Sequence, residues 1–310
     1  MILILASERD THARRVALEI ARLGQRALIL DWRAAGTGLR ASLRYAGGQV
    51  ERRVHADPGG HAWELSDVTA IWTRRPGSAA IAPGILDADH RAFAAAEWHH
   101  LMNGLIHGVT CINDLDAQRA AVKPVQLALA GRAGLAVPDT LITSDPAEAR
   151  AFIDAHAGAV VHKVMTSPRD VLLETRRWDE HDRELLQLLP MAPTIFQRLV
   201  TGSRDIRVTI VGQDLYAAAI DSELPATSVD SRLDLNAAFS EVQLPGEMAS
   251  GLRALMAGLG LTFATADLKI DDQGRFYFLE LNPQGQFLYV EILTGMPITL
   301  ALARLLTSAA

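Results

Sequence analysis

The segment Leu261–Asn282 constrains the fold more than any other part of the chain. Two apolar, β-prone runs flank the residues Asp271-Asp272-Gln273-Gly274, whose composition is typical of a turn. The pattern therefore predicts a β-hairpin. If Gln273-Gly274 forms a two-residue loop, Asp267 lies directly opposite Glu280, and two carboxylates in that position repel each other.

A hard cation between the two carboxylates makes this arrangement favourable. Side chains alternate between the faces of a strand, so Asn282 shares the face of Glu280, and Lys269 shares the face of Asp267, whose charge it is placed to balance. Mg²⁺ binds through a few protein oxygens together with waters and substrate phosphates. The hairpin thus predicts a magnesium site formed by Asp267, Glu280 and Asn282. The spacing alone leaves one alternative open, which is the solvated outer face of an ordinary hairpin.

Length and composition limit the class of protein. A chain of 310 residues exceeds the usual size of one core, so we expect two or three subdomains. The net charge of −6 gives no reason to expect a nucleic-acid partner. No run approaches the ~20 apolar residues needed to cross a bilayer. We therefore expect a cytoplasmic protein with no membrane partner, and the single cysteine, Cys111, excludes an internal disulfide.

The first hundred residues alternate between strand and helix patterns. Strands are predicted at Ile2–Ala6, Arg26–Asp31 and Val68–Trp72, with an amphipathic helix at Thr11–Leu23. This alternation predicts a small parallel α/β sheet. Because no G-x-G-x-x-G sequence follows the first strand, we do not expect a dinucleotide site.

The rest of the chain mixes helices and strands without a repeat. Helices are predicted at Leu86–His107, Ala117–Ala133 and Asp179–Leu188, with a further helix starting at Ser144-Asp145-Pro146. The other predicted strands are Thr140–Thr143, Ala159–Val164, Val171–Glu174, Thr194–Val200, Ile206–Val211 and Leu215–Ile220. The pattern predicts domains at 1–113, 114–192 and 193–310.

Taken in order, these residues resemble the ATP-grasp superfamily, in which two α+β lobes hold ATP. There an Asp on one strand and a Glu-x-Asn on the next hold Mg²⁺ against the ATP phosphates, and Asp267, Glu280 and Asn282 match these residue types. The resemblance implies ATP and Mg²⁺ as cofactors. It also implies a fold that combines α/β and α+β parts: a Rossmann-like pre-ATP-grasp domain over 1–113, a central lobe over 114–192 and a C-terminal lobe over 193–310.

The same resemblance implies the nucleotide-binding residues. Lys123 and Lys163 match the two lysines that such folds direct at the phosphates. The run Phe196–Val200 resembles the hinge strand whose backbone reads the adenine edge, which makes Gln197 and Leu199 candidates for nucleotide binding.

A second element of the superfamily is the Asp-Ile-Arg sequence, found here at residues 205–207. The resemblance places Asp205 near the ribose and directs Arg207 at a phosphate or acyl phosphate. An arginine inside an apolar strand is notable in itself, because burying it without a partner is costly. The candidate catalytic residues are Lys163, Arg207 and Arg232.

Within the superfamily the chain is most similar to the graspetide synthetases, which are microviridin-type peptide macrocyclases. The motifs that carry this likeness are Trp72-Thr73-Arg74-Arg75-Pro76, the run from Asn113 through Lys123 to Thr143, Asp230-Ser231-Arg232, Asn282-Pro283-Gln284-Gly285-Gln286-Phe287 and Thr294-Gly295-Met296-Pro297-Ile298. The chain departs from those enzymes at Thr73, where they commonly carry Tyr or another aromatic residue, and at Ser231 and Phe287, where they commonly carry Trp. These departures leave the particular peptide open.

The resemblance implies a precursor peptide with a leader segment as the substrate, and Arg74, Arg75 and Arg232 as residues that bind it. Arg232 is the candidate for holding the acceptor carboxylate, because a guanidinium grips a carboxylate through two hydrogen bonds. The alternative is a surface arginine paired with Asp230 or Asp234. Of Arg74 and Arg75, we expect one to be structural. A homodimer or larger homo-oligomer stays open.

The implied function is an ATP-dependent carboxylate ligase. It activates Asp or Glu side chains of a ribosomal precursor peptide as acyl phosphates and closes ω-ester or ω-amide rings. One alternative is a glutamate-type carboxylate–amine ligase that acts on a protein or small acid, although the loop Met165–Asp170 lacks the glycines that such ligases carry. A second alternative is a nucleotide-binding regulatory module without turnover.

Overall fold

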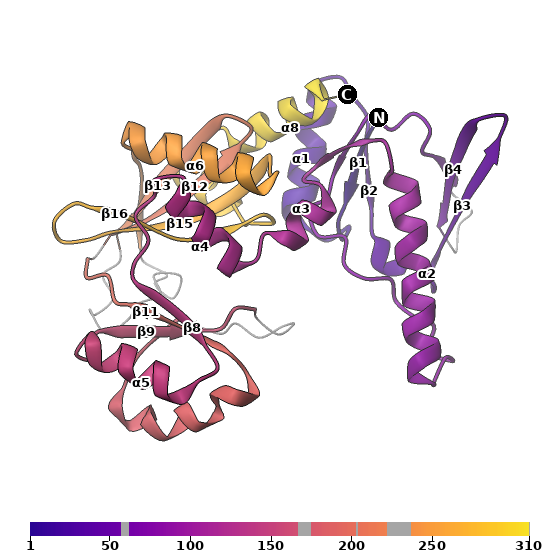
Figure 1. The fold of residues 1–310 in the computed structure, drawn as a ribbon. Coiled ribbons are helices and arrows are strands. Elements are labelled where there is room, and N and C mark those ends of the chain that lie inside the picture. Colours follow the sequence, from indigo (N-terminus) through magenta and orange to yellow (C-terminus); the bar gives the residue numbers. More distant parts are fainter. Residues whose placement is uncertain (57–61, 167–174, 203, 222–236, 310) are drawn as a thin grey trace. The chain divides into compact units, whose positions relative to one another are not determined.

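The computed structural model describes residues 1–56, 62–166, 175–202, 204–221 and 237–309 (Figure 1). It divides into two compact units. The first unit comprises Met1–Gln118, Gln286–Leu288 and Pro297–Ala310, and the second comprises Arg119–Gly285 and Tyr289–Met296. The C-terminal helix therefore groups with the N-terminal residues. The three predicted domains stay predictions.

A four-stranded parallel sheet forms the centre of the first unit. Its strand order is β2 (Ala27–Leu30), β1 (Ile2–Leu5), β6 (Ala70–Trp72) and β7 (Thr110–Ile112). The predicted parallel α/β sheet is thereby confirmed. The helices of this unit are α1 (Thr11–Arg22), η1 (Trp32–Ala34), α2 (Ala88–Ile106), α3 (Leu115–Ala120) and α8 (Ile298–Ser308). The residues of β1 are buried throughout, as expected for a strand covered on both faces.

A second, three-stranded sheet in the first unit was not predicted. It consists of β3 (Leu39–Ala46), β4 (Gln49–Ala56) and β5 (Ala62–Glu64), paired antiparallel. Gly47 and Gly48 form the turn between β3 and β4 with positive φ angles of 58° and 77°. Two successive residues with positive φ are what a two-residue hairpin turn requires, so this Gly-Gly pair carries the sequence signal for the hairpin.

The second unit contains two antiparallel sheets. The first has the order β10 (Arg176–Arg177), β9 (Val160–Lys163), β11 (Thr194–Arg198) and β8 (Thr140–Thr143). Its apolar face packs with α5 (Pro146–Ala155) and η2 (Glu180–Met191) around Ile153, Val160, Leu186, Leu189 and Phe196. Figure 1 shows α5 beside this sheet. The predicted charged helix at Asp179–Leu188 forms as the 3₁₀-helix η2, and the predicted strand Val171–Glu174 lies outside the described residues.

The other sheet has five strands. Its order is β14 (Ala238–Glu241), β13 (Asp214–Asp221), β12 (Arg204–Val211), β15 (Phe263–Ile270) and β16 (Phe276–Asn282). One face is apolar and buried, with Val208, Leu268 and Phe278 at most 1% exposed. The helices α4 (Lys123–Arg132) and α6 (Gly246–Leu259) contact each other, and α4 contacts β16. The opposite face is polar and carries the candidate site. The remaining helix is α7 (Leu288–Thr294).

The predicted helix at Ala117–Ala133 is two helices, α3 and α4. Pro124 lacks the backbone N–H that a helix interior needs, so it is tolerated only in a first turn. The helix accordingly breaks at Ala121 and Val122 and restarts at Lys123. Lys123 is therefore the first residue of a helix rather than an interior one. Among the described helices, none combines the length and apolar character needed to cross a membrane.

Candidate nucleotide and metal site

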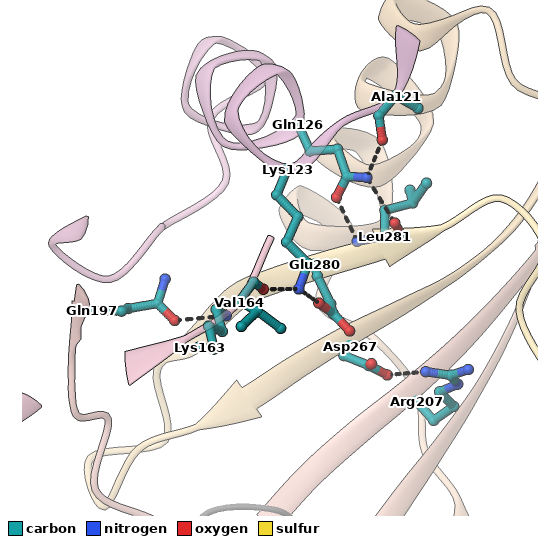
Figure 2. Close-up of polar contacts among 10 residues, drawn as sticks. All are labelled: Ala121, Lys123, Gln126, Lys163, Val164, Gln197, Arg207, Asp267, Glu280 and Leu281. Atoms are coloured by element: carbon teal, nitrogen blue, oxygen red, sulfur yellow. Dashed lines mark hydrogen bonds and ion pairs between the residues drawn. The ribbon is translucent and has the colours of Figure 1, made fainter. Parts of the chain in front are cut away.

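A row of charged side chains crosses the polar face of the five-stranded sheet. Arg207 on β12 lies opposite Asp267 on β15, and Asp267 lies opposite Glu280 on β16. Residues directly opposite one another place their side chains on the same face. Arg207 donates a hydrogen bond to Asp267 Oδ1 (Figure 2). The prediction that Asp267 faces Glu280 across the hairpin is confirmed.

The hairpin reaches this register by a route that differs from the predicted one. Asp271 N donates to Arg275 O at 3.0 Å, and Gly274 has a φ of 80°, so the loop has three residues rather than the predicted two. A β-bulge compensates. Leu268 pairs with Phe278, but Asp267 pairs with Glu280, which leaves one extra residue in β16. The two deviations cancel, and the carboxylates still meet.

Lys123 neutralises the second carboxylate of the row. Its Nζ lies 3.0 Å from Glu280 Oε2 and donates to Val164 O at 3.2 Å (Figure 2). The side chains of Asp267 and Glu280 are 30% and 28% exposed. Each carboxylate therefore has a cation beside it, and each remains partly exposed to solvent.

Arg207 is held by its aspartate. Burial lowers the pKa of this guanidinium, but the adjacent Asp267 carboxylate, with smaller contributions from Tyr289 and Glu280, more than offsets that effect, so the pKa is raised. Two residues away on the same face, Asp205 Oδ1 lies 2.8 Å from Lys269 Nζ. Lys269 thus pairs with Asp205 and not with Asp267, whose charge the sequence suggested it would balance.

Lys163 extends from the polar face of the four-stranded sheet. Its Nζ donates to Gln197 Oε1 at 3.2 Å (Figure 2). Gln197 Nε2 in turn donates to Thr140 Oγ1 at 2.8 Å. Gln197 is only 2% exposed, so its amide is a fixed acceptor for the ammonium. The N–H of Leu199 donates to Ala159 O at 2.8 Å. The nucleotide-binding roles of Gln197 and Leu199 stay predictions.

Asn282 follows Glu280 on the polar face and is exposed. Its Oδ1 accepts a hydrogen bond from Gln284 N at 2.9 Å, which folds the chain into a turn. The turn brings Gly285 against the hydroxyl of Thr265, where a Cβ atom would clash. Glycine at this position lets the loop after Asn282 lie close to the strand that carries Asp267.

These donors fit Mg²⁺. Within the described part of the chain, no group of three or more His, Cys, Asp and Glu side chains is placed to hold a metal ion. Two carboxylates and one amide oxygen in neighbouring positions are, however, a set of hard ligands. Mg²⁺ typically takes one or two carboxylates and completes its octahedron with waters and substrate phosphates. Asp267, Glu280 and Asn282 match that requirement.

The two adjacent arginines of the first unit differ in exposure. Arg74 is 1% exposed, its Nε lies 3.5 Å from Asp10 Oδ2, and its guanidinium lies 5.8 Å from the centre of the Trp72 ring. Burial lowers the pKa of Arg74 to about 10, although Asp10 opposes the shift. Arg75 is exposed. Of Arg74 and Arg75, the second is the one accessible to a substrate, and Arg232 lies outside the described residues.

Sequence reasoning missed one residue beside the row. Gln126 is buried and hydrogen-bonds to the backbone of Leu281, the residue between Glu280 and Asn282 (Figure 2). The sequence did carry one signal for Gln126. It follows Lys123 by three residues, and residues three apart on a helix lie on the same face.

Comparisons with known proteins identify the fold of the chain. Residues 1–121 match the family model described as the MvdD pre-ATP grasp domain. Over its whole length the chain is similar to the macrocyclase MdnC from Microcystis aeruginosa MRC, solved with the precursor peptide MdnA, at 26% identity, full coverage of both chains and a TM-score of 0.87. The chain has the ATP-grasp fold.

Two further ATP-grasp ligases show the same fold. One is a RiPP-associated ligase from Chryseobacterium gregarium in complex with ADP and a leader and core peptide, at 23% identity, with 100% of this chain and 97% of that chain covered and a TM-score of 0.87. The other is PsnB, complexed with a precursor variant, Mg and ADP, at 24% identity, with 99% and 98% covered and a TM-score of 0.81. No curated protein sequence matches the chain. The predicted resemblance to ATP-grasp peptide macrocyclases and the predicted fold class are confirmed.

Proposed function

We propose that this ATP-grasp protein is an ATP- and Mg²⁺-dependent ligase that closes rings in a ribosomal precursor peptide. It activates Asp or Glu side chains as acyl phosphates and joins them to Ser, Thr or Lys side chains as ω-esters or ω-amides. The observation that carries the proposal is the pair Asp267 and Glu280 on one polar face, flanked by the cations Arg207 and Lys123. The likeness to a macrocyclase solved with its precursor peptide supports the peptide substrate.

Activation of a carboxylate requires neutralisation of charge and alignment more than covalent help from the protein. Asp267, Glu280 and Asn282 would hold Mg²⁺, which supplies positive charge for the ATP phosphates. Lys123 and Lys163 contribute ammonium groups from two different elements. Lys163 is held by the buried amide of Gln197, so its direction is set before the nucleotide arrives.

The reaction has two displacements. A peptide carboxylate oxygen first attacks the γ-phosphorus of ATP, and ADP leaves with the electrons of the broken P–O bond. A hydroxyl or amine then attacks the acyl carbon, loses its proton, and displaces inorganic phosphate. Arg207 lies in the row with Asp267 and is suited to hold the negative charge of the acyl phosphate.

Recognition of the peptide is assigned to arginines. Arg75, which is exposed, is a candidate for binding an acidic segment of the precursor or its leader, and Arg232 for holding the carboxylate that reacts. Arg74 is a weaker candidate, because its guanidinium lies beside Asp10 and is almost fully buried.

The test is co-expression with a short peptide encoded beside the gene and rich in Thr, Ser, Glu, Asp and Lys. Each ring should lower the intact peptide mass by one water, ~18 Da, because an acid condenses with an alcohol or amine. The Glu280→Gln variant should leave the peptide mass unchanged. A mass increase equal to an added amino acid would instead support a carboxylate–amine ligase, and an unchanged mass with the wild-type protein would contradict the proposal.

A further inference from the structure

The strand that carries Glu280 lies at the edge of its sheet. In the order β14-β13-β12-β15-β16, β16 has a strand partner on one side only among the strands that the structure describes. The outward backbone groups of an edge strand need other partners. At Leu281 a single side chain provides them: Gln126 Oε1 accepts from Leu281 N at 2.9 Å, and Gln126 Nε2 donates to Leu281 O at 2.8 Å (Figure 2). Gln126 therefore bonds to β16 as a neighbouring strand would.

The amide of Gln126 has little freedom. The residue is 3% exposed, and its Nε2 also donates to Ala121 O at 2.6 Å (Figure 2). An amide offers two N–H donors and one oxygen, so both donors and the acceptor are used. Any rotation breaks at least one buried hydrogen bond and leaves backbone groups unpaired, which costs about 1–3 kcal/mol for each group.

This contact is made close to an interruption of the β-ladder. The register between β15 and β16 shifts at the bulge, directly before the pair Asp267 and Glu280. A bulge interrupts the ladder, so the strand there is held less firmly by its neighbour. Outward contacts hold β16 on both sides of Glu280: Phe278 N donates to Ala136 O at 2.8 Å, and Leu281 bonds to Gln126.

The same helix supplies the cation for Glu280. Lys123 precedes Gln126 by three residues on α4, so the two side chains lie on one face of the helix. Gln126 bonds to Leu281, and Lys123 pairs with the adjacent Glu280 (Figure 2). The amide of Gln126 thus fixes α4 relative to the Glu280 carboxylate. Because Lys123 is on the same helix, its ammonium group is positioned beside Glu280 by the same contact.

We propose that Gln126 is a positioning residue for the magnesium ligands. It acts by fixing the peptide unit of Leu281, so that Glu280 and Asn282 are presented to the ion together with Lys123. The inference rests on the proposed function, because it assigns Gln126 to the metal site of that function.

The test measures ADP binding by calorimetry, with Mg²⁺ present and with the metal chelated. Gln126→Met keeps the volume of the side chain but removes its hydrogen bonds to Leu281. Loss of a residue that orients a metal ligand typically costs 10–100-fold in metal affinity. We expect the affinity for ADP in Mg²⁺ to fall by about 10–100-fold, while the affinity for metal-free ADP stays close to that of the wild type.

Thr143→Val is the matched control. Thr143 is also buried, and its hydroxyl donates to Glu148 Oε2 at 3.0 Å and accepts from Asp145 N at 2.9 Å at the start of α5. This variant should lower the thermal midpoint while leaving Mg²⁺-dependent ADP binding unchanged. Gln126→Asn is a milder second variant, because it retains a buried amide that is one methylene too short to reach Leu281, and it is measured in place of Gln126→Met if that protein does not fold.

The outcomes separate the two proposals. Equal Mg²⁺-dependent affinities in the wild type and the Gln126 variant, with only a lower thermal midpoint, would overturn the positioning role and leave the proposed function standing. A wild-type protein whose ADP affinity does not respond to Mg²⁺ would overturn the proposed function itself. A loss confined to Mg²⁺-dependent binding supports both.

Discussion

Arg74 in the first unit and Arg207 in the second are both largely buried arginines that pair with an aspartate, but their aspartates are used differently. Asp10, the partner of Arg74, is the N-cap of α1, and its Oδ1 accepts from Ala13 N at 2.9 Å. Asp267, the partner of Arg207, caps no helix and lies beside a second carboxylate, Glu280. One aspartate completes a helix, and the other brings negative charge to a polar face.

The two arginines define two clusters: a closed cluster of Arg74, Asp10 and His12, and an open cluster of Arg207, Asp267, Glu280 and Lys123. Exposure to solvent separates these clusters further. Around Arg74, the side chains of Asp10 and His12 are 12% and 11% exposed. The carboxylates beside Arg207 are about a third exposed. The comparison indicates that a buried ion pair is structural when its members also bond to the local backbone. It indicates a binding site when the charged groups, even if paired with one another, are left where a ligand can reach them.

The largest expected effect is on the open cluster. Glu280→Gln removes one of the two carboxylates that define the metal site and leaves Lys123 without its anion. ATP-dependent turnover should fall by about 1,000-fold, which corresponds to ~4 kcal/mol of barrier. Steady-state ADP release measures this. Glu241→Gln, an exposed change on β14 of the same sheet, is the control and should be near wild type.

A change in the closed cluster should affect stability instead. Arg74→Met leaves Asp10 buried beside an uncharged side chain, and removing one partner of a buried ion pair costs about 3–4 kcal/mol of unfolding free energy. Urea denaturation measures the loss. Arg75→Met, one residue along and exposed, should change stability by less than about 0.5 kcal/mol. Equal stability of the two variants would contradict the structural role of the Arg74–Asp10 pair.

The closed cluster should also respond to acid through His12. Burial, with the nearby Arg74, lowers the pKa of His12 from 6.5 to about 4, and its Nε2 accepts from Phe287 N at 3.1 Å. Between these values the unfolded chain binds a proton that the folded chain does not. Stability is therefore complete above pH 6.5 and falls by about 3 kcal/mol as the pH drops to 4.

The measurement is chemical denaturation at several pH values in that window. His12→Gln keeps a hydrogen-bond acceptor but does not titrate. The stability of this variant should therefore fall by about 3 kcal/mol less than that of the wild type as the pH drops from 6.5 to 4. His90→Gln, at an exposed histidine, should retain the wild-type dependence. If the wild type and His12→Gln lose stability in parallel, the claim that His12 stays neutral in the folded protein is wrong.

The smallest expected effect distinguishes two lysines of the second unit. Lys163→Met removes the ammonium held by Gln197 and should weaken turnover by about 30-fold, or ~2 kcal/mol. Lys269→Met removes only the partner of Asp205 and should cost severalfold at most. ATP affinity and turnover of the two variants test this order. Comparable activity in Lys163→Met and the wild type would remove Lys163 from the site.

Much of the architecture was predictable because hydrophobic alternation and turn residues report local structure directly. The pairing of Asp267 with Glu280 was predicted from a two-residue loop that does not form. The three-residue turn and the bulge each shift the register by one, and strand patterns do not reveal a bulge whose extra residue, like Leu279, is apolar. The correct pairing therefore depends on two features that the sequence pattern did not show.

Features that depend on tertiary contacts could not be predicted as well from the sequence. Nothing local distinguishes Arg74 from Arg75, because burial depends on what packs against each side chain. The role of Gln126 depends on Leu281, a contact 155 residues away in sequence. The break before Lys123, by contrast, was readable from Pro124, which restricts the helix to restart there.

The central claim is that the polar face of the second unit activates a peptide carboxylate as an acyl phosphate. The direct measurement uses a precursor peptide whose Asp and Glu carboxylates carry a heavy oxygen isotope, incubated with the protein, Mg²⁺ and ATP. In the proposed chemistry one carboxylate oxygen leaves with the phosphate. Each ring closed should therefore place one heavy oxygen in the inorganic phosphate and release one ADP. Ring closure without label in the phosphate would contradict the account.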